Sequence, residues 1–189
     1  MAKAVPNHRN DVVAALAGRR IDAKDAKVVQ FPLANVPAVK LSLSELLRKE
    51  QVGLLICSAA SGADLLALDA ALDTGIRCRI ILPFDPKHFR RTSVVDRPGD
   101  WGGLFDRIIS LVDGEGGLIV LNGDVSAECS YQQANEAIIR EAVTASNTRP
   151  LAILVWEGRP RAKDDATAEF RRLASAAGML ERIVPTLCN

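Results

Sequence analysis

The sequence predicts a three-layer α/β domain of Rossmann-like type, in which helices cover both faces of a mostly parallel sheet of about six strands. Short apolar runs of strand length recur along the 189 residues, and helical patterns lie between them. Strands that are apolar on both faces are typical of parallel sheets buried between helices. Because the chain has no repeat, low-complexity tract or shift of composition, we expect one domain over residues 11–189 after a flexible tail at 1–10.

Six strands are expected, and right-handed crossovers should join them in a parallel sheet. Each is a run of four to six mainly apolar residues, a normal strand length, and the last run is the weakest. Their ranges are 12–17, 52–57, 77–82, 118–121, 151–156 and 183–187.

Five helices are expected between these strands. The first has apolar residues at Val39, Leu43, Leu46 and Leu47, the second is stopped by Gly75, and the third follows Asp100 as a candidate N-cap. Asp165 or Thr167 is the candidate N-cap of the last helix. Their ranges are 36–49, 65–73, 101–112, about 131–145 and 167–177.

The composition is that of a globular protein, with 48% apolar and 25% charged residues. The net charge of +1 gives no overall attraction to nucleic acid or to membranes, so any anion site must be local. One Tyr, two Trp and five Phe leave few rings for stacking on bases. We therefore expect neither a nucleic-acid partner nor a membrane partner.

The four cysteines lie far apart without a C-x-x-C pair, and only two histidines accompany them. This distribution disfavours a structural metal site, and we expect no metal and no cofactor. Cys57 and Cys78 fall in apolar runs where buried free thiols are usual. Charged residues interrupt every apolar run before the ~20 residues that a bilayer requires, and the N-terminus lacks a signal-peptide pattern. We expect a reduced, cytoplasmic protein.

Ligands of such sheets lie beyond the carboxyl ends of the strands, where the strand order reverses. The loops at that edge are 18–22, 58–64, 83–100, 122–128 and 157–166. Binding residues are therefore expected in these five segments.

The segment from Ser58 to Asp64 consists mainly of small residues and leads from a strand into a helix. Small side chains let a ligand approach the backbone, and a helix start offers free N–H groups. We expect the Ser58 and Ser61 side chains and the backbone around Gly62 to contact a phosphate, with Asp64 facing a sugar hydroxyl or orienting an arginine. The alternative is close packing of helix on strand. Ala59 and Ala63 complete this predicted site.

Gly18, Arg19 and Arg20 follow the first strand and offer a turn with guanidinium groups suited to bidentate phosphate contacts. An ordinary surface turn would look the same. Loop 83–100 is longer than usual connections, which is typical of lids and binding loops, although it could also be a solvated excursion. It contributes Pro83, Phe84 and Arg97 to the predicted site.

The loop after the fifth strand contributes Trp156, Gly158 and Thr167. Trp156 at a strand end could stack on a base or belong to the core. Tyr131 and Asn135 lie about one helical turn apart and could project toward the same edge of the sheet, or form a surface pair.

Two motifs together resemble the SLOG superfamily, which includes the DNA-processing protein A and lonely-guy families. They are Gly18-x-Arg20 after the first strand and Ser58-Ala-Ala-x-Gly62-Ala-Asp64-x-Leu-Ala67 after the second, where the family commonly has G-G-A-x-G-A/I-D-x-x-A. The resemblance implies a Rossmann-like sheet whose loops hold a nucleotide or a nucleotide derivative.

Lonely-guy enzymes cleave nucleoside monophosphates to base and ribose phosphate and share the motif P-G-G-x-G-T-x-x-E. The corresponding loop here lacks the paired glycines, and Phe170 stands where the motif has its carboxylate. We therefore expect a binding or sensing domain for a nucleotide-like small molecule. One alternative is a nucleotide N-glycosidase using Glu157, Asp165 or Glu169, and another is a protein interaction scaffold. Apolar helix faces are also compatible with a homodimer.

Overall fold

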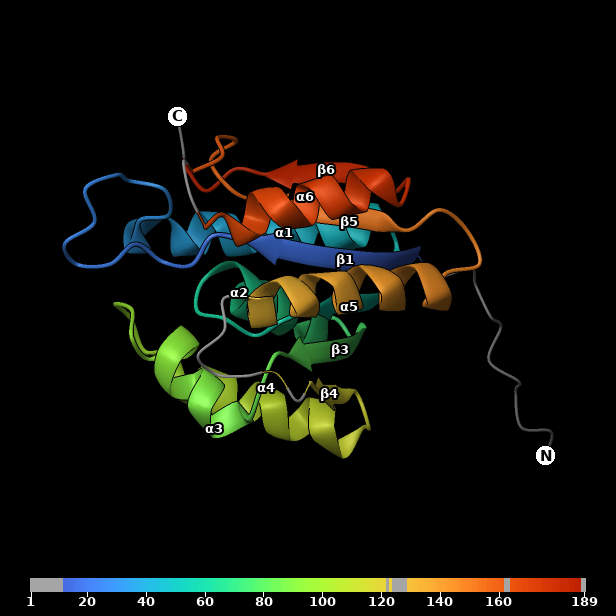
Figure 1. Ribbon diagram of the computed structural model, residues 1–189, viewed down its shortest axis with the longest axis horizontal. Coiled ribbons are helices and arrows are strands. Elements are labelled where there is room, and N and C mark those ends of the chain that lie inside the picture. The colour runs from blue at the N-terminus through green and yellow to red at the C-terminus, as the bar shows by residue number, and fades with distance from the viewer. Residues whose placement is uncertain (1–11, 122, 124–128, 162–163, 188–189) are drawn as a thin grey trace.

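A six-stranded parallel sheet with the order β4-β3-β2-β1-β5-β6 forms the centre of the molecule, as the computed structural model in Figure 1 shows. The structure describes residues 12–121, 123, 129–161 and 164–187. The expected three-layer fold is confirmed. The strands are β1 (Val12–Gly18), β2 (Val52–Cys57), β3 (Arg77–Leu82), β4 (Leu118–Val120), β5 (Leu151–Val155) and β6 (Leu180–Val184).

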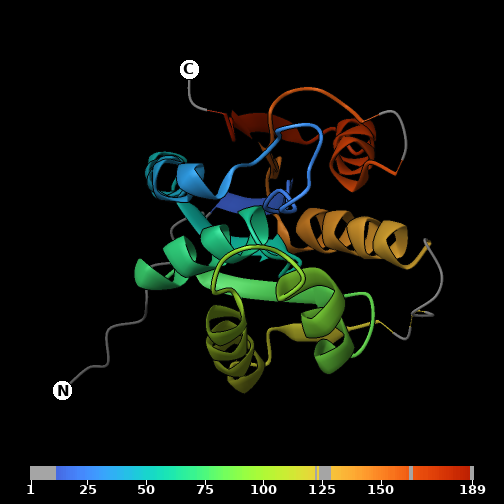
Figure 2. The same ribbon diagram turned by 90° about the vertical axis from the view of Figure 1, so that its left-hand side faces the viewer.

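Helices cover both faces of this sheet, and Figure 2 shows the sheet between the two layers. One layer contains α1 (Val36–Lys49), α2 (Ala63–Asp73) and α4 (Gly102–Gly114), and the other contains α5 (Cys129–Ala145) and α6 (Ala166–Ala176). Short helical elements are η1 (Leu33–Asn35), α3 (Pro86–Phe89) and the π-helical turn η2 (Arg90–Val94).

Two apolar cores separate the layers because successive strand residues face opposite sides of the sheet. In β1, Ala14 and Leu16 pack toward α1, α2 and α4, whereas Val13 and Ala15 pack toward α5 and α6. The helix α2 is buried along nearly its whole length, because α1 and α4 flank it on the sheet. This close packing of α2 fixes the segment from Ser58 to Asp64 at the carboxyl edge of the sheet.

Two expectations for the elements were wrong. The last strand is Leu180–Val184 rather than 183–187, because Leu151 of β5 pairs with Leu180 and sets the register. Residues 83–100 are not an open loop but contain α3 and η2. The Asp85 side chain accepts hydrogen bonds from the N–H groups of Lys87 and His88, which starts α3 directly after β3.

The helix caps also differ in part from expectation. Trp101 rather than Asp100 precedes α4, and Asp165 is the N-cap of α6, where its Oδ1 accepts a hydrogen bond of 3.0 Å from the N–H of Ala168. Asp165 was one of the two expected caps. Thr167 instead lies inside the first turn of α6 and is buried.

The two cysteines in the apolar runs follow the prediction. Cys57 and Cys78 are buried and free, as predicted.

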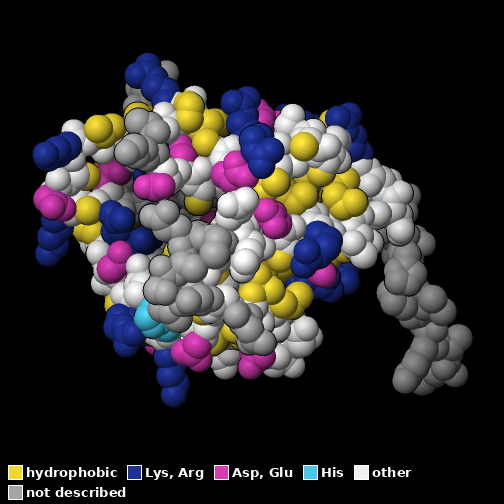
Figure 3. Space-filling model, in the orientation of Figure 1, with side chains coloured by type: hydrophobic (Ala, Val, Ile, Leu, Met, Phe, Trp, Pro, Cys, Tyr) yellow, Lys and Arg dark blue, Asp and Glu magenta, His cyan; other side chains and the backbone are white. Residues whose placement is uncertain are grey.

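Among the described residues, none of the helices is both long and apolar enough to cross a bilayer, and no cluster of His, Cys, Asp and Glu side chains could hold a metal ion. The tail at 1–10, most of the 122–128 loop and Lys163 lie outside the described residues. Figure 3 shows acidic and basic side chains interspersed over the visible face.

Candidate functional site

A cavity of about 400 Å³ lies at the carboxyl edge of the sheet. The chain runs from β1 outward to β2, β3 and β4 on one side and places β5 and β6 on the other, so the strand order reverses beside β1. Such a reversal is where open α/β sheets bind ligands. The end of β1, the loops after β1, β2, β3 and β5, and the first turns of α5 and α6 form the wall.

The structure brings about half of the predicted binding residues to this cavity. Those in the wall are Gly18, Arg19, Arg20, Ser58, Asp64, Arg97 and Thr167. The others lie outside it: Ala59, Ser61, Gly62, Ala63, Pro83, Phe84, Trp156 and Gly158. Trp156 is only 2% exposed and packs in the core on the α5 and α6 side, where the guanidinium groups of Arg19 and Arg171 lie 5.4 and 5.6 Å from the centroid of its ring.

The first turn of α2 is closed by the protein itself. The N–H groups of Ser61 and Ala63 donate to the carbonyl oxygens of Ser93 and Arg19, at 3.0 and 3.1 Å. The N–H of Ala60 donates to the Asp64 carboxylate at 3.1 Å. These three N–H groups are among the donors that a phosphate at this helix start would use. The segment thus has the geometry of close packing between a helix and a neighbouring loop.

Gly62 makes this close approach feasible. Its φ of +96° is one that residues with a side chain rarely adopt, and a Cβ atom at this position would lie 2.8 Å from the carbonyl oxygen of Arg19. The glycine therefore serves contact between two protein segments, the loop after β1 and the start of α2.

Arg19 links the end of β1 to the loop after β5 through hydrogen bonds of its side chain. Its guanidinium is 2% exposed and donates from Nε to Glu157 Oε2 at 2.8 Å and from Nη2 to Asp165 Oδ2 at 3.0 Å. Nη2 also donates to the carbonyl oxygen of Arg159 at 2.7 Å. Burial lowers the pKa of Arg19, but its bonds to the two carboxylates outweigh this and raise it above the usual value. Arg19 is thereby saturated by protein acceptors.

All three carboxylates considered for catalysis accept hydrogen bonds from arginine side chains. Burial raises the pKa of Glu157 and of Asp165. The hydrogen bonds from Arg19 and from other donors lower both pKa values by more than this, so each lies below its usual range. Glu169 lies on α6 and pairs with Arg172, which lowers its pKa. None of the three is in the wall of the cavity. Carboxylates held ionised in this way are poor proton donors.

Three other arginines reach the cavity from three different loops, and we call Arg20, Arg97 and Arg161 the arginine rim. Arg20 donates a hydrogen bond to Asp96, and Arg97 Nε lies 3.5 Å from the same carboxylate. Neither Arg20 Nε nor Arg97 Nε has a hydrogen-bond partner among the described residues, although both atoms are buried. One carboxylate thus serves two guanidinium groups.

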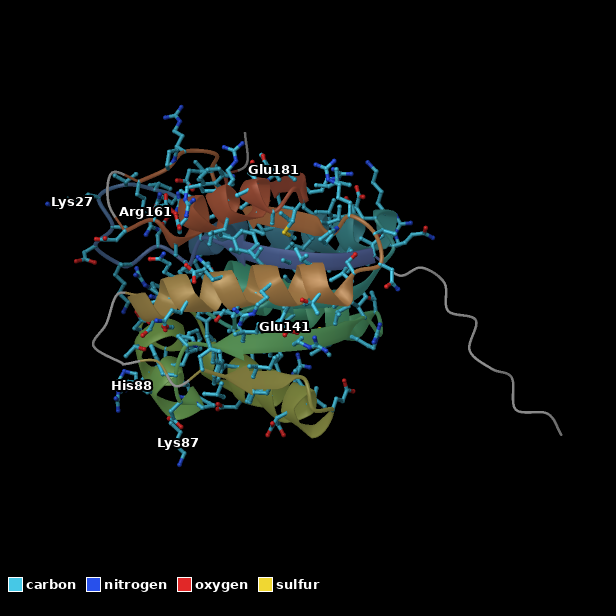
Figure 4. All side chains as sticks on the ribbon, turned by 45° about the vertical axis from the view of Figure 1, so that its right-hand side comes forward. Lys27, Lys87, His88, Glu141, Arg161 and Glu181 are labelled. Atoms are coloured by element: carbon cyan, nitrogen blue, oxygen red, sulfur yellow. The ribbon has the colours of Figure 1, made fainter. Side chains whose placement is uncertain are left out.

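Arg161 completes the rim with a neutral partner. Its Nε donates to Gln30 Oε1 at 2.7 Å, and Figure 4 shows Arg161 at the same end of the sheet as Lys27. Burial lowers the pKa of Arg161, and the positive charges of Arg19 and Arg97 lower it further. An anion bound between these guanidinium groups would relieve that repulsion.

Asp64 is a buried carboxyl group in the same wall. It is 8% exposed, and burial raises its pKa from 3.8 to about 7, against the smaller lowering effects of the Ala60 N–H and the charge of Arg20. A carboxyl group that titrates near neutral pH inside a cavity is a frequent mark of a functional site.

An uncharged part of the wall comes from one face of α5. Tyr131, Ala134, Asn135 and Ile138 follow the helical spacing and all line the cavity. Of the two interpretations open for Tyr131 and Asn135, the structure supports projection toward this edge of the sheet. The sequence analysis did not include Ser93, Gln30 and Arg161 among the site residues, although all three line the cavity. Helical periodicity within 83–100 was the available signal for Ser93. Its hydroxyl oxygen lies 2.9 Å from that of Tyr131.

The fold and the cavity define a Rossmann-like α/β domain with a ligand-sized cavity at the reversal of its strand order. No protein-family model matches the chain, and no curated protein matches its sequence. Among solved structures, it is similar to DNA processing protein A (DprA) from Streptococcus pneumoniae, with a TM-score of 0.51 and 18% identity. The match covers 93% of this chain and 50% of that chain. The likeness shows a DprA-related fold, and this chain spans about half the length of that protein.

Proposed function

We propose that this chain is a SLOG-type domain that binds or senses a nucleotide or a nucleotide derivative in the cavity beside β1. The observation that carries the proposal is the arginine rim around a cavity of about 400 Å³ at the reversal of strand order. This volume is within the usual range for small-molecule sites, which is roughly 300–1,000 Å³.

The anionic part of the ligand is assigned to the arginine rim rather than to the start of α2. The N–H groups of Ser61 and Ala63 already have acceptors, whereas Arg20 Nε and Arg97 Nε have none among the described residues. Guanidinium groups bind phosphate oxygens through short, charge-assisted hydrogen bonds. Asp64 is suited to a sugar hydroxyl, since its carboxyl group can donate or accept a hydrogen bond near neutral pH.

Phosphate contacts alone do not account for useful affinity. Two charge-assisted hydrogen bonds contribute about 1.5–3 kcal/mol each, while micromolar binding requires about 8 kcal/mol. The remainder must come from contacts to the sugar and the base. The apolar and hydroxyl-bearing wall of α5 and Ser93 offers such contacts.

Calorimetry and thermal-shift measurements with mononucleotides, dinucleotides and ADP-ribose test this proposal. We expect at least one of them to bind, and Arg161→Gln to weaken it about tenfold or more because one charge-assisted contact is lost. Arg172→Gln is the matched control, since Arg172 pairs with Glu169 away from the cavity. If no compound in the panel gives a response in either assay, the proposal is wrong.

A short single-stranded DNA belongs in the same panel because the structurally similar protein is a DNA processing protein. Binding of the oligonucleotide without binding of any mononucleotide would favour a nucleic-acid ligand. We expect the reverse, given the net charge of +1.

The second candidate function is hydrolysis of the N-glycosidic bond of a nucleotide, and Asp64 is the observation that favours it. Among the carboxyl groups in the wall, Asp64 has its pKa raised to about 7, which suits proton transfer at neutral pH. Incubation with nucleoside monophosphates followed by chromatography would reveal free base. Release of base by the wild type but not by Asp64→Asn would establish an enzyme instead of a sensor.

A further inference from the structure

One amide side chain in the cavity wall is held in a single orientation by a hydrogen bond. Asn135 on α5 is 8% exposed, and its Nδ2 donates to the carbonyl oxygen of Ala166 at 2.9 Å. A carbonyl oxygen can only accept, so the amide cannot turn over without losing this bond. The amide orientation is therefore set by the start of α6.

The other end of this amide is the carbonyl oxygen Oδ1. No described residue donates a hydrogen bond to it, and Asn135 belongs to the cavity wall. At Oδ1, Asn135 thus offers a ligand an acceptor and no donor while its bond to Ala166 persists, and the second N–H of Nδ2 stays a separate donor. The neighbouring hydroxyl groups of Ser93 and Tyr131 differ in this respect, because either can donate or accept.

We propose that Asn135 selects a nucleobase that carries an exocyclic amino group, by accepting a hydrogen bond from that group through Oδ1. This inference rests on the proposed nucleotide site and specifies its ligand class. A base with a carbonyl group at the same position would place two acceptors against each other. Adenine and cytosine carry this amino group, whereas hypoxanthine and uracil have a carbonyl oxygen in its place and could donate only from a ring N–H.

The surroundings of Asn135 suit a flat, partly apolar base. Ala134 and Ile138 lie on the same face of α5, and Tyr131 stands one turn before Asn135. The Tyr131 ring is held edge-to-face against Phe84, with ring centroids 5.8 Å apart. The arginine rim comes from other loops, so the base and the phosphate have separate contact groups.

Paired ligands that differ in one substituent test the proposal. Calorimetry should compare adenosine with inosine 5′-monophosphate, and cytidine with uridine 5′-monophosphate. We expect the amino-bearing member of at least one pair to bind about tenfold more tightly, the effect of one hydrogen bond and one avoided repulsion.

Two variants test this role. Asn135→Leu removes both functions of the amide and should abolish the preference. Asn135→Asp keeps an acceptor oxygen but sets a second oxygen against the carbonyl oxygen of Ala166, so it should also lose most of the preference. Gln132→Leu is the control, because Gln132 lies on the same helix and bonds only to the exposed Glu136 in the described part of the chain.

Each outcome decides between the two proposals. Equal affinity of the wild type for both members of each pair overturns the role of Asn135 and leaves nucleotide binding intact. Retention of the preference in Asn135→Leu would overturn the role of Asn135, because other groups would then carry the preference. Absence of binding by every nucleotide overturns the proposed function and this inference together. The comparison of ligands on the wild type decides the matter even if a variant does not fold.

Discussion

Arg19 and Arg20 are neighbours at the end of β1 and have opposite surroundings. Arg19 is 2% exposed and its guanidinium is saturated by Glu157, Asp165 and the carbonyl oxygen of Arg159. Arg20 has a side chain that is 27% exposed, shares Asp96 with Arg97, and has an Nε without a partner among the described residues. The same residue type thus serves as framework at one position and as a candidate ligand contact at the next.

The comparison extends to the regions around the two arginines. Around Arg19, the start of α2 and the loop after β5 form an inner region in which the charged groups and several backbone N–H groups have partners, although Ser61 Oγ and Trp156 Nε1 have none among the described residues. Around Arg20, the arginine rim forms an outer region whose polar groups are only partly satisfied. Buried groups without partners are costly unless a ligand or water completes them. The difference separates residues needed for folding from residues available for binding.

The largest effect is expected from Arg19→Met. This change leaves Glu157 and Asp165 buried without their cation, and breaking a buried pair in this way costs about 3–5 kcal/mol. Urea unfolding should show the loss directly. A change below about 1 kcal/mol would mean that the inner region is not the framework described above.

Gly62→Ala should be the next most damaging change. The positive φ and the approach of 2.8 Å to the carbonyl oxygen of Arg19 add strain and a steric clash, for roughly 2–3 kcal/mol. Gly75→Ala is the control, since Gly75 also has positive φ but no atom near the added Cβ, and should cost about 1 kcal/mol. Equal losses of the free energy of unfolding in both variants would remove the clash from the explanation.

Asp64 lies where the two regions meet and should make stability depend on pH. Its pKa of about 7 in the folded state exceeds the value of 3.8, so the folded protein retains a proton that the unfolded chain has lost. The free energy of unfolding should therefore fall as pH rises from about 4 to 7 and level off above 7, with roughly 2 kcal/mol lost between pH 5 and 7.

Asp64→Asn should flatten this pH profile. Glu157 and Asp165 do not interfere, because their pKa values are lowered and they titrate in more acidic solution. Urea unfolding of both proteins at pH 5, 6, 7 and 8 provides the measurement. Parallel profiles for the wild type and the variant would assign the pH dependence to other groups.

The smallest effect on stability is expected from Arg97→Gln in the outer region. Its contact with Asp96 is 3.5 Å long and both side chains are about one-third exposed, so the free energy of unfolding should change by about 0.5 kcal/mol or less. Thermal melting without ligand is the measurement. A loss as large as that of Arg19→Met would erase the distinction between the two regions.

The fold was largely predictable because its elements have clear local signals. The bounds of β2, β3 and α1 match the expected ranges, since apolar runs and periodic leucines end at polar residues. The edge strand β6 was misplaced because its residues alternate between partly buried and exposed, and only pairing with β5 fixes its register. The helical turns of 83–100 depend on the Asp85 cap and on burial of Phe89.

The position of the cavity was predictable from the sequence, but the contacts around it were not. The loops at the carboxyl edge follow from the alternation of strands and helices, and the cavity lies among them. Sequence alone could not show that the N–H groups at the start of α2 would find acceptors in Arg19 and Ser93. Nor could it pair Arg19 with Glu157, which lies 138 residues further along the chain.

That sequence separation has a consequence for the order of events during synthesis. The strands β1 to β4 and the helices α1, α2 and α4 are made first, and domains can begin to fold while the chain is still being made. The wall of the cavity also needs α5, Arg161 and the start of α6, and the guanidinium of Arg19 needs Glu157 and Asp165. In the nascent chain, the guanidinium of Arg19 at the carboxyl edge of the sheet would therefore lack its carboxylate partners until the loop after β5 docks. Ligand binding would then distinguish completed molecules from partly made ones.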